Sequence, residues 1–158
     1  MSDFPQRGRL LGLDHGLARV GVAVCDASQM IATELIVIDR TSKKADFARI
    51  NQICADEGVA GIVLGLPLDL DAPPDTYTQA DRVRLWAGRF AATTDLPVLL
   101  WDEQLSSEEA SEMARLQKRK PTDPVDDLAA RVILQRYLDA VRDGLVERME
   151  IVGQDDPA

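Results

Sequence analysis

Three acidic residues stand where a buried element of the fold would begin or end. Asp14 follows the apolar segment 10–13, and Glu103 follows the apolar segment 97–101 after one intervening acid. Asp126 lies where the first turn of a C-terminal helix is expected. Ligands of α/β proteins gather at the carboxyl ends of parallel strands, so these carboxylates are candidates for a shared site.

Asp126 precedes Ala130, Ile133 and Tyr137 by four, seven and eleven residues, which places it on their apolar helix face. An acid directed at the core is costly to desolvate unless a positive charge compensates it. If Asp14 and Glu103 lie on neighbouring strand ends, three carboxylates converge, and a pair of divalent cations would relieve their repulsion. Oxygen ligands favour Mg²⁺ or Mn²⁺, and two such ions about 4 Å apart suit phosphodiester hydrolysis.

Each acid also has a purely structural interpretation. Asp14 fits a turn residue, Glu103 fits a loop acid, and Asp126 fits an acid that complements the dipole at a helix start. The only histidine, His15, is expected to be a loop residue beside the metal site rather than part of a Ser-His-Asp arrangement. Periodicity alone does not show that the three carboxylates converge.

Positive charge is concentrated in one short segment of an acidic chain. The formal net charge is −9, with 27 acidic and 18 basic residues, which argues against nucleic-acid binding by bulk electrostatics. The segment 115–120 nevertheless contains four cations and no acid: Arg115, Lys118, Arg119 and Lys120. This patch is either a phosphate contact or a solvated helix end whose cations complement the dipole.

The elements that must position these residues alternate between strand and helix patterns. Apolar segments at 9–14, 19–25 and 33–39 predict a strand meander, and 61–65 and 97–101 predict two further strands. Helical spacing predicts helices from an N-cap at Thr41 or Ser42 to Gly58, around 83–90, from Ser106, and from Asp123 to about Arg142. This order predicts an α/β domain with a mixed sheet that is antiparallel on one side and parallel on the other.

Length and composition predict one domain over residues 1–158, with a core of about 9–142 and a polar tail at 145–158. No stretch is apolar enough to span a bilayer and the start lacks a signal-peptide core, so we expect a cytoplasmic protein. Cys25 and Cys54 lie in apolar stretches and are expected to be core thiols. Trp86 and Trp101 are expected in the core rather than as base-stacking platforms.

Four spaced motifs resemble the YqgF/RuvX family of RuvC-like Holliday junction resolvases, also described as pre-16S rRNA nucleases. They are "LGLDHGLARVGVAVCD", "VLGLPLDLD", "LPVLLWDEQLSSEEA" and "VDDLAARVILQRYLD", and the resemblance extends over roughly residues 10–139. The resemblance implies a ribonuclease H-like fold, a five-stranded mixed sheet flanked by helices. It also implies that Asp14, Glu103 and Asp126 are the catalytic metal ligands. Arg19 matches the family's basic residue and is either a phosphate contact or an arginine on the surface of the hairpin.

The chain departs from the family pattern beside the second acid. The family usually has Arg after the Glu and then a Thr pair, whereas this chain has Gln104, Ser106 and Ser107. Loss of the arginine removes a permanent charge that could hold a phosphate. This departure puts substrate affinity in doubt more than metal binding.

The resemblance implies an endonuclease that uses two Mg²⁺ or Mn²⁺ ions and processes the 5′ end of pre-16S rRNA. Its partners would be nucleic acid and ribosomal precursor particles, and the chain would be a monomer or a homodimer. A Holliday junction resolvase and a noncatalytic module bound to nucleic acid or the ribosome remain alternatives. A nucleotide-binding domain of the actin and hexokinase type is disfavoured, since 158 residues leave no second lobe.

Overall fold

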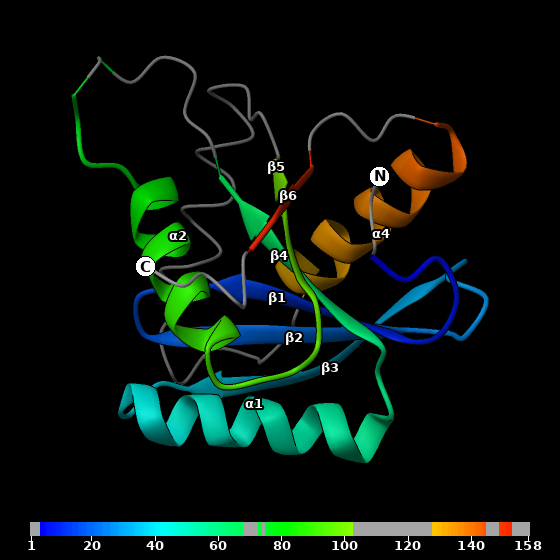
Figure 1. The fold of residues 1–158 in the computed structure, drawn as a ribbon, viewed down its shortest axis with the longest axis horizontal. Helices are drawn as coiled ribbons and strands as arrows, with labels where there is room; N and C mark the ends of the chain where they lie inside the picture. The colour runs from blue at the N-terminus through cyan, green and yellow to red at the C-terminus, as the bar shows by residue number, and fades with distance from the viewer. Residues whose placement is uncertain (1–3, 68–72, 74, 103–127, 145–148, 153–158) are drawn as a thin grey trace.

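A six-stranded mixed sheet with the order β3-β2-β1-β4-β5-β6 organises the chain (Figure 1). The computed structural model describes residues 4–67, 73, 75–102, 128–144 and 149–152. The antiparallel meander consists of β1 (Leu10–His15), β2 (Arg19–Cys25) and β3 (Ala32–Asp39). The other half consists of β4 (Gly61–Leu66) and β5 (Val98–Asp102), both parallel to β1, and β6 (Met149–Ile151), antiparallel to β5.

Local sequence signals define the ends of the first two helices. Ser42 caps α1 (Lys43–Glu57) by accepting a hydrogen bond from the Ala45 amide at 3.1 Å, and Gly58 ends it with φ 63°. Thr78 and Asp81 form a capping box at the start of α2 (Gln79–Ala91). The described part of the last helix, α4 (Leu128–Arg142), ends shortly before Gly144, whose φ is 77°.

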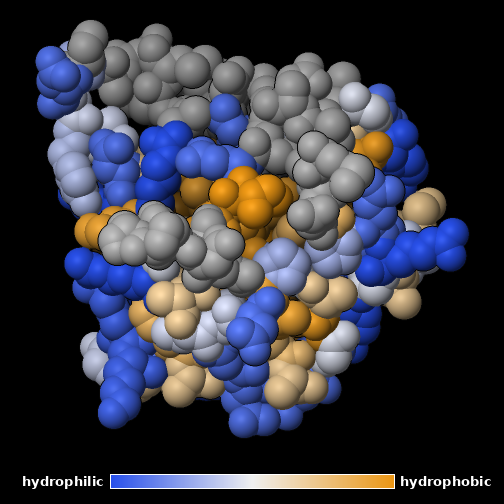
Figure 2. Space-filling model, in the orientation of Figure 1, coloured by the Kyte–Doolittle hydropathy of each residue, from blue (hydrophilic) through white to orange (hydrophobic). Residues whose placement is uncertain are grey.

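The helices cover the two faces of the sheet (Figure 1). On one face α1 and α2 pack on a core that includes Leu13, Val22 and Leu64. On the other face α4 packs on a second core that includes Leu99 and Trp101. In the space-filling view, hydrophobic residues lie at the centre of the visible face, and many hydrophilic side chains lie toward its outline (Figure 2).

Two glycines allow α4 to approach the sheet closely. A Cβ at Gly12 would lie 2.8 Å from Cβ of Leu134, and a Cβ at Gly65 would lie 2.6 Å from Cδ1 of Ile133. Side chains at these two positions would push the helix away from the strands. The distance between α4 and the strands β1 and β4 therefore depends on the absence of side chains at Gly12 and Gly65.

The expected fold class is confirmed, with one strand more than the five expected. The segment expected to follow the core as a polar tail contributes β6, whose three residues pair with Leu99, Leu100 and Trp101 of β5. The helix expected from Ser106, and the start of the last helix at Asp123, lie outside the described residues.

Three smaller expectations concern single residues and membrane spans. Cys25 and Cys54 are buried free thiols, which confirms that they belong to the core. Trp86 and Trp101 are both buried in the cores. Across the described residues, no helix combines the length and the apolar character needed to cross a bilayer.

Candidate functional site at the carboxyl end of the sheet

Asp14 stands near the carboxyl end of the central strand β1, on the face covered by α4. It pairs with Gly21 of β2 and is half-buried. A Cβ at Gly21 would lie 3.7 Å from Cβ of Asp14 and 3.4 Å from Cβ of Ala130 on α4. A side chain at this position would therefore contact both Asp14 and α4, and glycine places none there. A carboxylate oxygen at this place is the kind of donor that a hard divalent cation prefers.

Neighbouring parallel strands end at the same edge of the sheet. Leu13 of β1 pairs with Leu64 of β4, and Leu66 at the end of β4 pairs with Asp102 of β5. Leu64 and Leu66 belong to the core under α1 and α2, so strand alternation sends the Asp102 side chain to that face, opposite Asp14. Oδ1 of Asp102 is buried and has no hydrogen-bond partner in the described part of the chain.

The other two predicted metal ligands, Glu103 and Asp126, lie outside the described residues. Among the residues that are described, no three His, Cys, Asp or Glu side chains are grouped closely enough to hold a metal ion. The helix face that was expected to carry Asp126 does point into the core: Ala130, Ile133 and Tyr137 are all buried there. Of the three acids, the structure therefore places Asp14.

Arg19 begins β2 two residues before Gly21, so its side chain lies on the same face of the sheet as Asp14. Its Nε is 3.8 Å from Oδ1 of Asp39 on the neighbouring strand β3. The four cations of the predicted basic patch lie in segment 115–120, outside the described residues.

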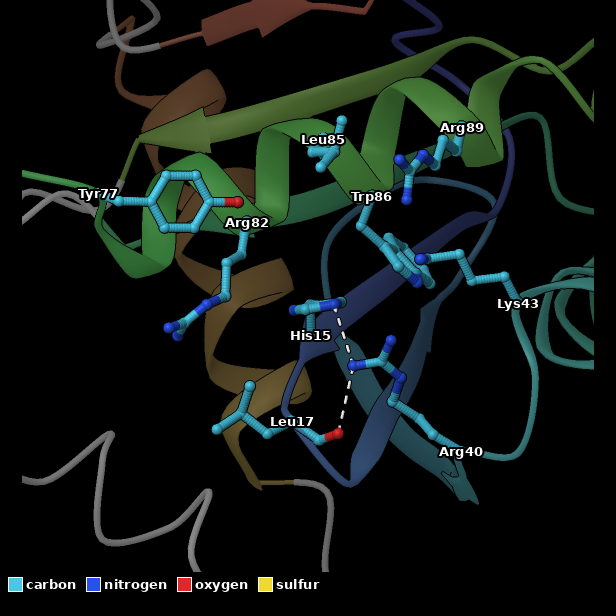
Figure 3. A pocket seen from close by; sticks show the side chains of 9 residues that line it. All are labelled: His15, Leu17, Arg40, Lys43, Tyr77, Arg82, Leu85, Trp86 and Arg89. Carbon is cyan, nitrogen blue, oxygen red and sulfur yellow. Dashed lines mark hydrogen bonds between the residues drawn. The ribbon is translucent and has the colours of Figure 1, made fainter.

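Sequence reasoning missed a basic pocket on the opposite face of the sheet, where the end of β1 meets α1 and α2 (Figure 3). The pocket encloses about 230 Å³. We call it the β1–α2 pocket; it is lined by His15, Leu17, Arg40, Lys43, Tyr77, Arg82, Leu85, Trp86 and Arg89. A partial signal was present in the sequence, because Arg82 and Arg89 are two helical turns apart on one face of α2.

His15 lies at the base of this pocket rather than in a loop beside the metal site, so that expectation was wrong. It is the last residue of β1, and only 5% of it is exposed. Its ring centroid is 5.0 Å from that of Trp86, and its Nε2 is 3.3 Å from Nη1 of Arg40. Burial, reinforced by the positive charge of Arg40, lowers the pKa of His15 to about 4, so the imidazole is neutral at pH 7.

Arg40 fixes the turn between β1 and β2. Its Nη1 donates to the carbonyl oxygens of Gly16 at 2.8 Å and Leu17 at 3.3 Å. Its Nε is 3.9 Å from Oδ2 of Asp46, a buried carboxylate near the start of α1. Arg40 therefore links two parts of the fold: the β1–β2 hairpin, on which Asp14 lies, and the helix layer beneath this hairpin.

The strand order and the helices on both faces define an α/β domain of the RuvC type. The structure is similar to one of Thermus thermophilus RuvC in complex with a Holliday junction substrate, with a TM-score of 0.55 and 14% sequence identity. That likeness covers 87% of this chain and 97% of RuvC, and it establishes the shared fold.

Sequence comparison identifies the family within this class. A family model described as "RuvX: Holliday junction resolvase" matches residues 8–140, so the chain belongs to the RuvX family. A relative from Bradyrhizobium sp. (strain ORS 278), named "Putative pre-16S rRNA nuclease", is 40% identical over 86% of this chain and 85% of its own length. A relative of the same name from Acaryochloris marina is 42% identical over 85% of this chain and 94% of its own length. The family and these relatives place the chain among the nucleases.

Proposed function

We propose that this chain is a metal-dependent endonuclease that hydrolyses phosphodiester bonds at the 5′ end of pre-16S rRNA. The substrate is taken from the name that its relatives carry. The structural observation that supports the proposal is the half-buried Asp14 near the end of the central strand, paired with Gly21, which places no side chain against it.

In this proposal Asp14, Glu103 and Asp126 hold Mg²⁺ or Mn²⁺, most simply as two ions. Their carboxylates supply the oxygen donors that these ions prefer. When bound, the ions lower the pKa of an attacking water and stabilise the leaving oxygen. Hydrolysis then leaves a 5′-phosphate on one product and a 3′-hydroxyl on the other.

Cations of the chain position the RNA backbone in this proposal. Arg19 lies on the same face of the sheet as Asp14 and offers a planar guanidinium to a phosphate. The basic segment 115–120 supplies further phosphate contacts. Gln104, which stands in place of the usual family arginine, offers hydrogen bonds but no charge.

The first test is cleavage of a labelled RNA that carries the 5′ end of the 16S precursor, with Mg²⁺ or Mn²⁺ or with a chelator. We expect metal-dependent cleavage that Asp14→Asn reduces on the order of 100-fold, because a metal ligand loses its charge. Asp143→Asn, the same change at an exposed position beyond α4, is the matched control and keeps wild-type activity. Equal cleavage by wild type and Asp14→Asn would show a contaminating nuclease and contradict the proposal.

A four-way DNA junction is the competing substrate in the same assay. The description of the family model and the likeness to RuvC favour it as the second candidate. Cleavage of the junction but not of the RNA would replace the rRNA assignment. Binding of RNA without cleavage of either substrate would point to a noncatalytic module.

A further inference from the structure

The β1–α2 pocket gathers positive charge on a chain whose net charge is −9. Four of its nine lining residues are cations (Arg40, Lys43, Arg82 and Arg89), and none of the described residues that line it is acidic. They come from the residue after β3, the first turn of α1 and two positions of α2 that are two turns apart, so the fold rather than the local sequence collects them. Like charges gathered around a cavity repel each other, and a bound anion would relieve that repulsion.

Few carboxylates compensate these cations. Arg40 has Asp46 at 3.9 Å, while Arg82 is 3.3 Å from the amide oxygen of Gln79 and 5.8 Å from the centre of the Tyr77 ring. Lys43 and Arg89 form no ion pair within the described ranges. The pocket therefore presents cations whose charge is available to a ligand.

Two buried ring nitrogens at the pocket also have no partner in the described part of the chain: Nδ1 of His15 and Nε1 of Trp86. Arg40 can only donate, so Nε2 of His15 accepts from it and Nδ1 of the neutral ring carries the hydrogen. A buried donor without an acceptor is costly, and an anion oxygen would satisfy it. Figure 3 shows the His15 ring between the side chains of Arg40 and Arg82.

The donor set suits a phosphate group. Guanidinium groups match phosphate oxygens with paired hydrogen bonds, and lysine adds a point charge. Tyr77 at the rim is 62% exposed and offers a ring on which a base can stack, whereas Trp86 is too buried to do so. A phosphate with an adjoining base is the repeating unit of a nucleic acid.

We propose that the β1–α2 pocket binds a backbone phosphate of the nucleic acid substrate, on the face of the sheet opposite Asp14. This assignment rests on the proposed nuclease function for the identity of the ligand. Asp14 and His15 are consecutive residues whose side chains lie on opposite faces of β1. A single-stranded RNA that crosses the turn between β1 and β2 would therefore reach both.

The test measures binding of a fluorescent single-stranded RNA of about 12 nucleotides by anisotropy, over a range of salt concentrations and with a chelator present. The pocket variant is Lys43→Gln with Arg89→Gln, because both side chains are exposed and neither forms a described ion pair. The control is Lys44→Gln with Arg49→Gln, which removes the same charge from exposed positions of α1 outside the pocket.

We expect the pocket variant to weaken RNA binding about tenfold at low salt and to flatten the salt slope by about 1.4, roughly 0.7 for each lost phosphate contact. The control variant is expected to change both quantities much less. Equal losses in the two variants would show that only bulk charge matters, and an unchanged pocket variant would remove the pocket from the interface. Either result overturns the proposal.

A second measurement separates a nucleic-acid phosphate from a free phosphate ligand. His15 is the only histidine, so its ring signals in a proton NMR spectrum report on the pocket without further assignment. Both the RNA and inorganic pyrophosphate should shift these signals in the wild type and not in the pocket variant. A shift with pyrophosphate but not with RNA would overturn the nucleic-acid assignment. Because both measurements are made without metal, they stand whether or not the chain cleaves RNA.

Discussion

The fold makes the single histidine a pH-sensitive element of stability. Burial, and then the charge of Arg40, lowers the pKa of His15 from 6.5 to about 4 in the folded chain. Between these two pH values the unfolded chain binds a proton that the folded chain does not, so the free energy of unfolding falls as the pH falls from 6.5 toward 4. The contribution of neutral His15 to the free energy of unfolding is fully present above pH 6.5. At pH 5, roughly 2 kcal/mol of this contribution is lost.

Urea denaturation of wild type and His15→Gln at pH 7.5 and pH 5 checks this prediction. Other groups also titrate in this range, but they are common to both proteins. The wild type is therefore expected to lose about 2 kcal/mol more than the variant between the two pH values. Equal losses would show that His15 titrates alike in the folded and unfolded states.

Single residues differ in how far their place could be predicted from sequence. Asp14 was found because a carboxylate ends an apolar strand. His15 was assigned to a loop because β1 was expected to end one residue earlier, and nothing local indicates that Trp86 would cover its ring. The cations of the β1–α2 pocket are separated by up to 49 positions, from Arg40 to Arg89, and only the packing of α1 and α2 on the sheet brings them together.

At the scale of elements, the close approach of α4 to β1 should be sensitive to one methyl group. Gly12→Ala places a Cβ 2.8 Å from Cβ of Leu134 and 3.3 Å from the carbonyl oxygen of Ala130, so the helix must move. We expect a loss of about 1–3 kcal/mol in the free energy of unfolding, the usual cost of overpacking.

Gly88→Ala is the matched comparison in a helix. A Cβ at Gly88 in α2 would meet nothing within 4 Å, so only helix propensity changes. This variant should gain about 0.5–1 kcal/mol. Urea denaturation of Gly12→Ala and Gly88→Ala measures the difference between their free energies of unfolding. Similar values for the two variants would show that α4 adjusts to the added methyl group without cost.

Element boundaries were predictable where a local signal exists. The sequence offers Thr41 or Ser42 as the N-cap of α1 and Gly58 as its end, and the structure uses Ser42 and Gly58 as the caps. β6 has no such signal, because three residues are too few to show alternation and the strand exists only through its pairing with β5. Glu103 and Asp126 remain predictions, since both lie outside the described residues.

At the scale of the whole molecule, β6 closes one side of the sheet. Residues 98–101 of β5 are buried, and β6 pairs with its outer edge. Deletion of residues 145–158 would leave the edge of this apolar strand unpaired, which favours association between chains. We expect a lower unfolding midpoint in urea and increased light scattering at high protein concentration.

A shorter deletion, of residues 153–158, is the control for this prediction. It keeps β6 and the hydrogen bond from the Val152 amide to the carbonyl of Val98 at 2.9 Å. The shorter chain should therefore behave like the full chain. If both truncated proteins were as stable and as monodisperse as the full chain, β6 would contribute nothing to the closure of the sheet.

Side chains of β1 point alternately to the two faces of the sheet, so the register of this strand is as important as its composition. One peptide bond separates an acid that faces α4 from an imidazole that faces Trp86. Inserting or deleting one residue earlier in the strand would move each of these side chains to the opposite face of the sheet. The acid would then be buried against the indole of Trp86, and the imidazole would face α4. We therefore expect natural variation in this segment to consist of substitutions, while length changes are confined to the turns at either end.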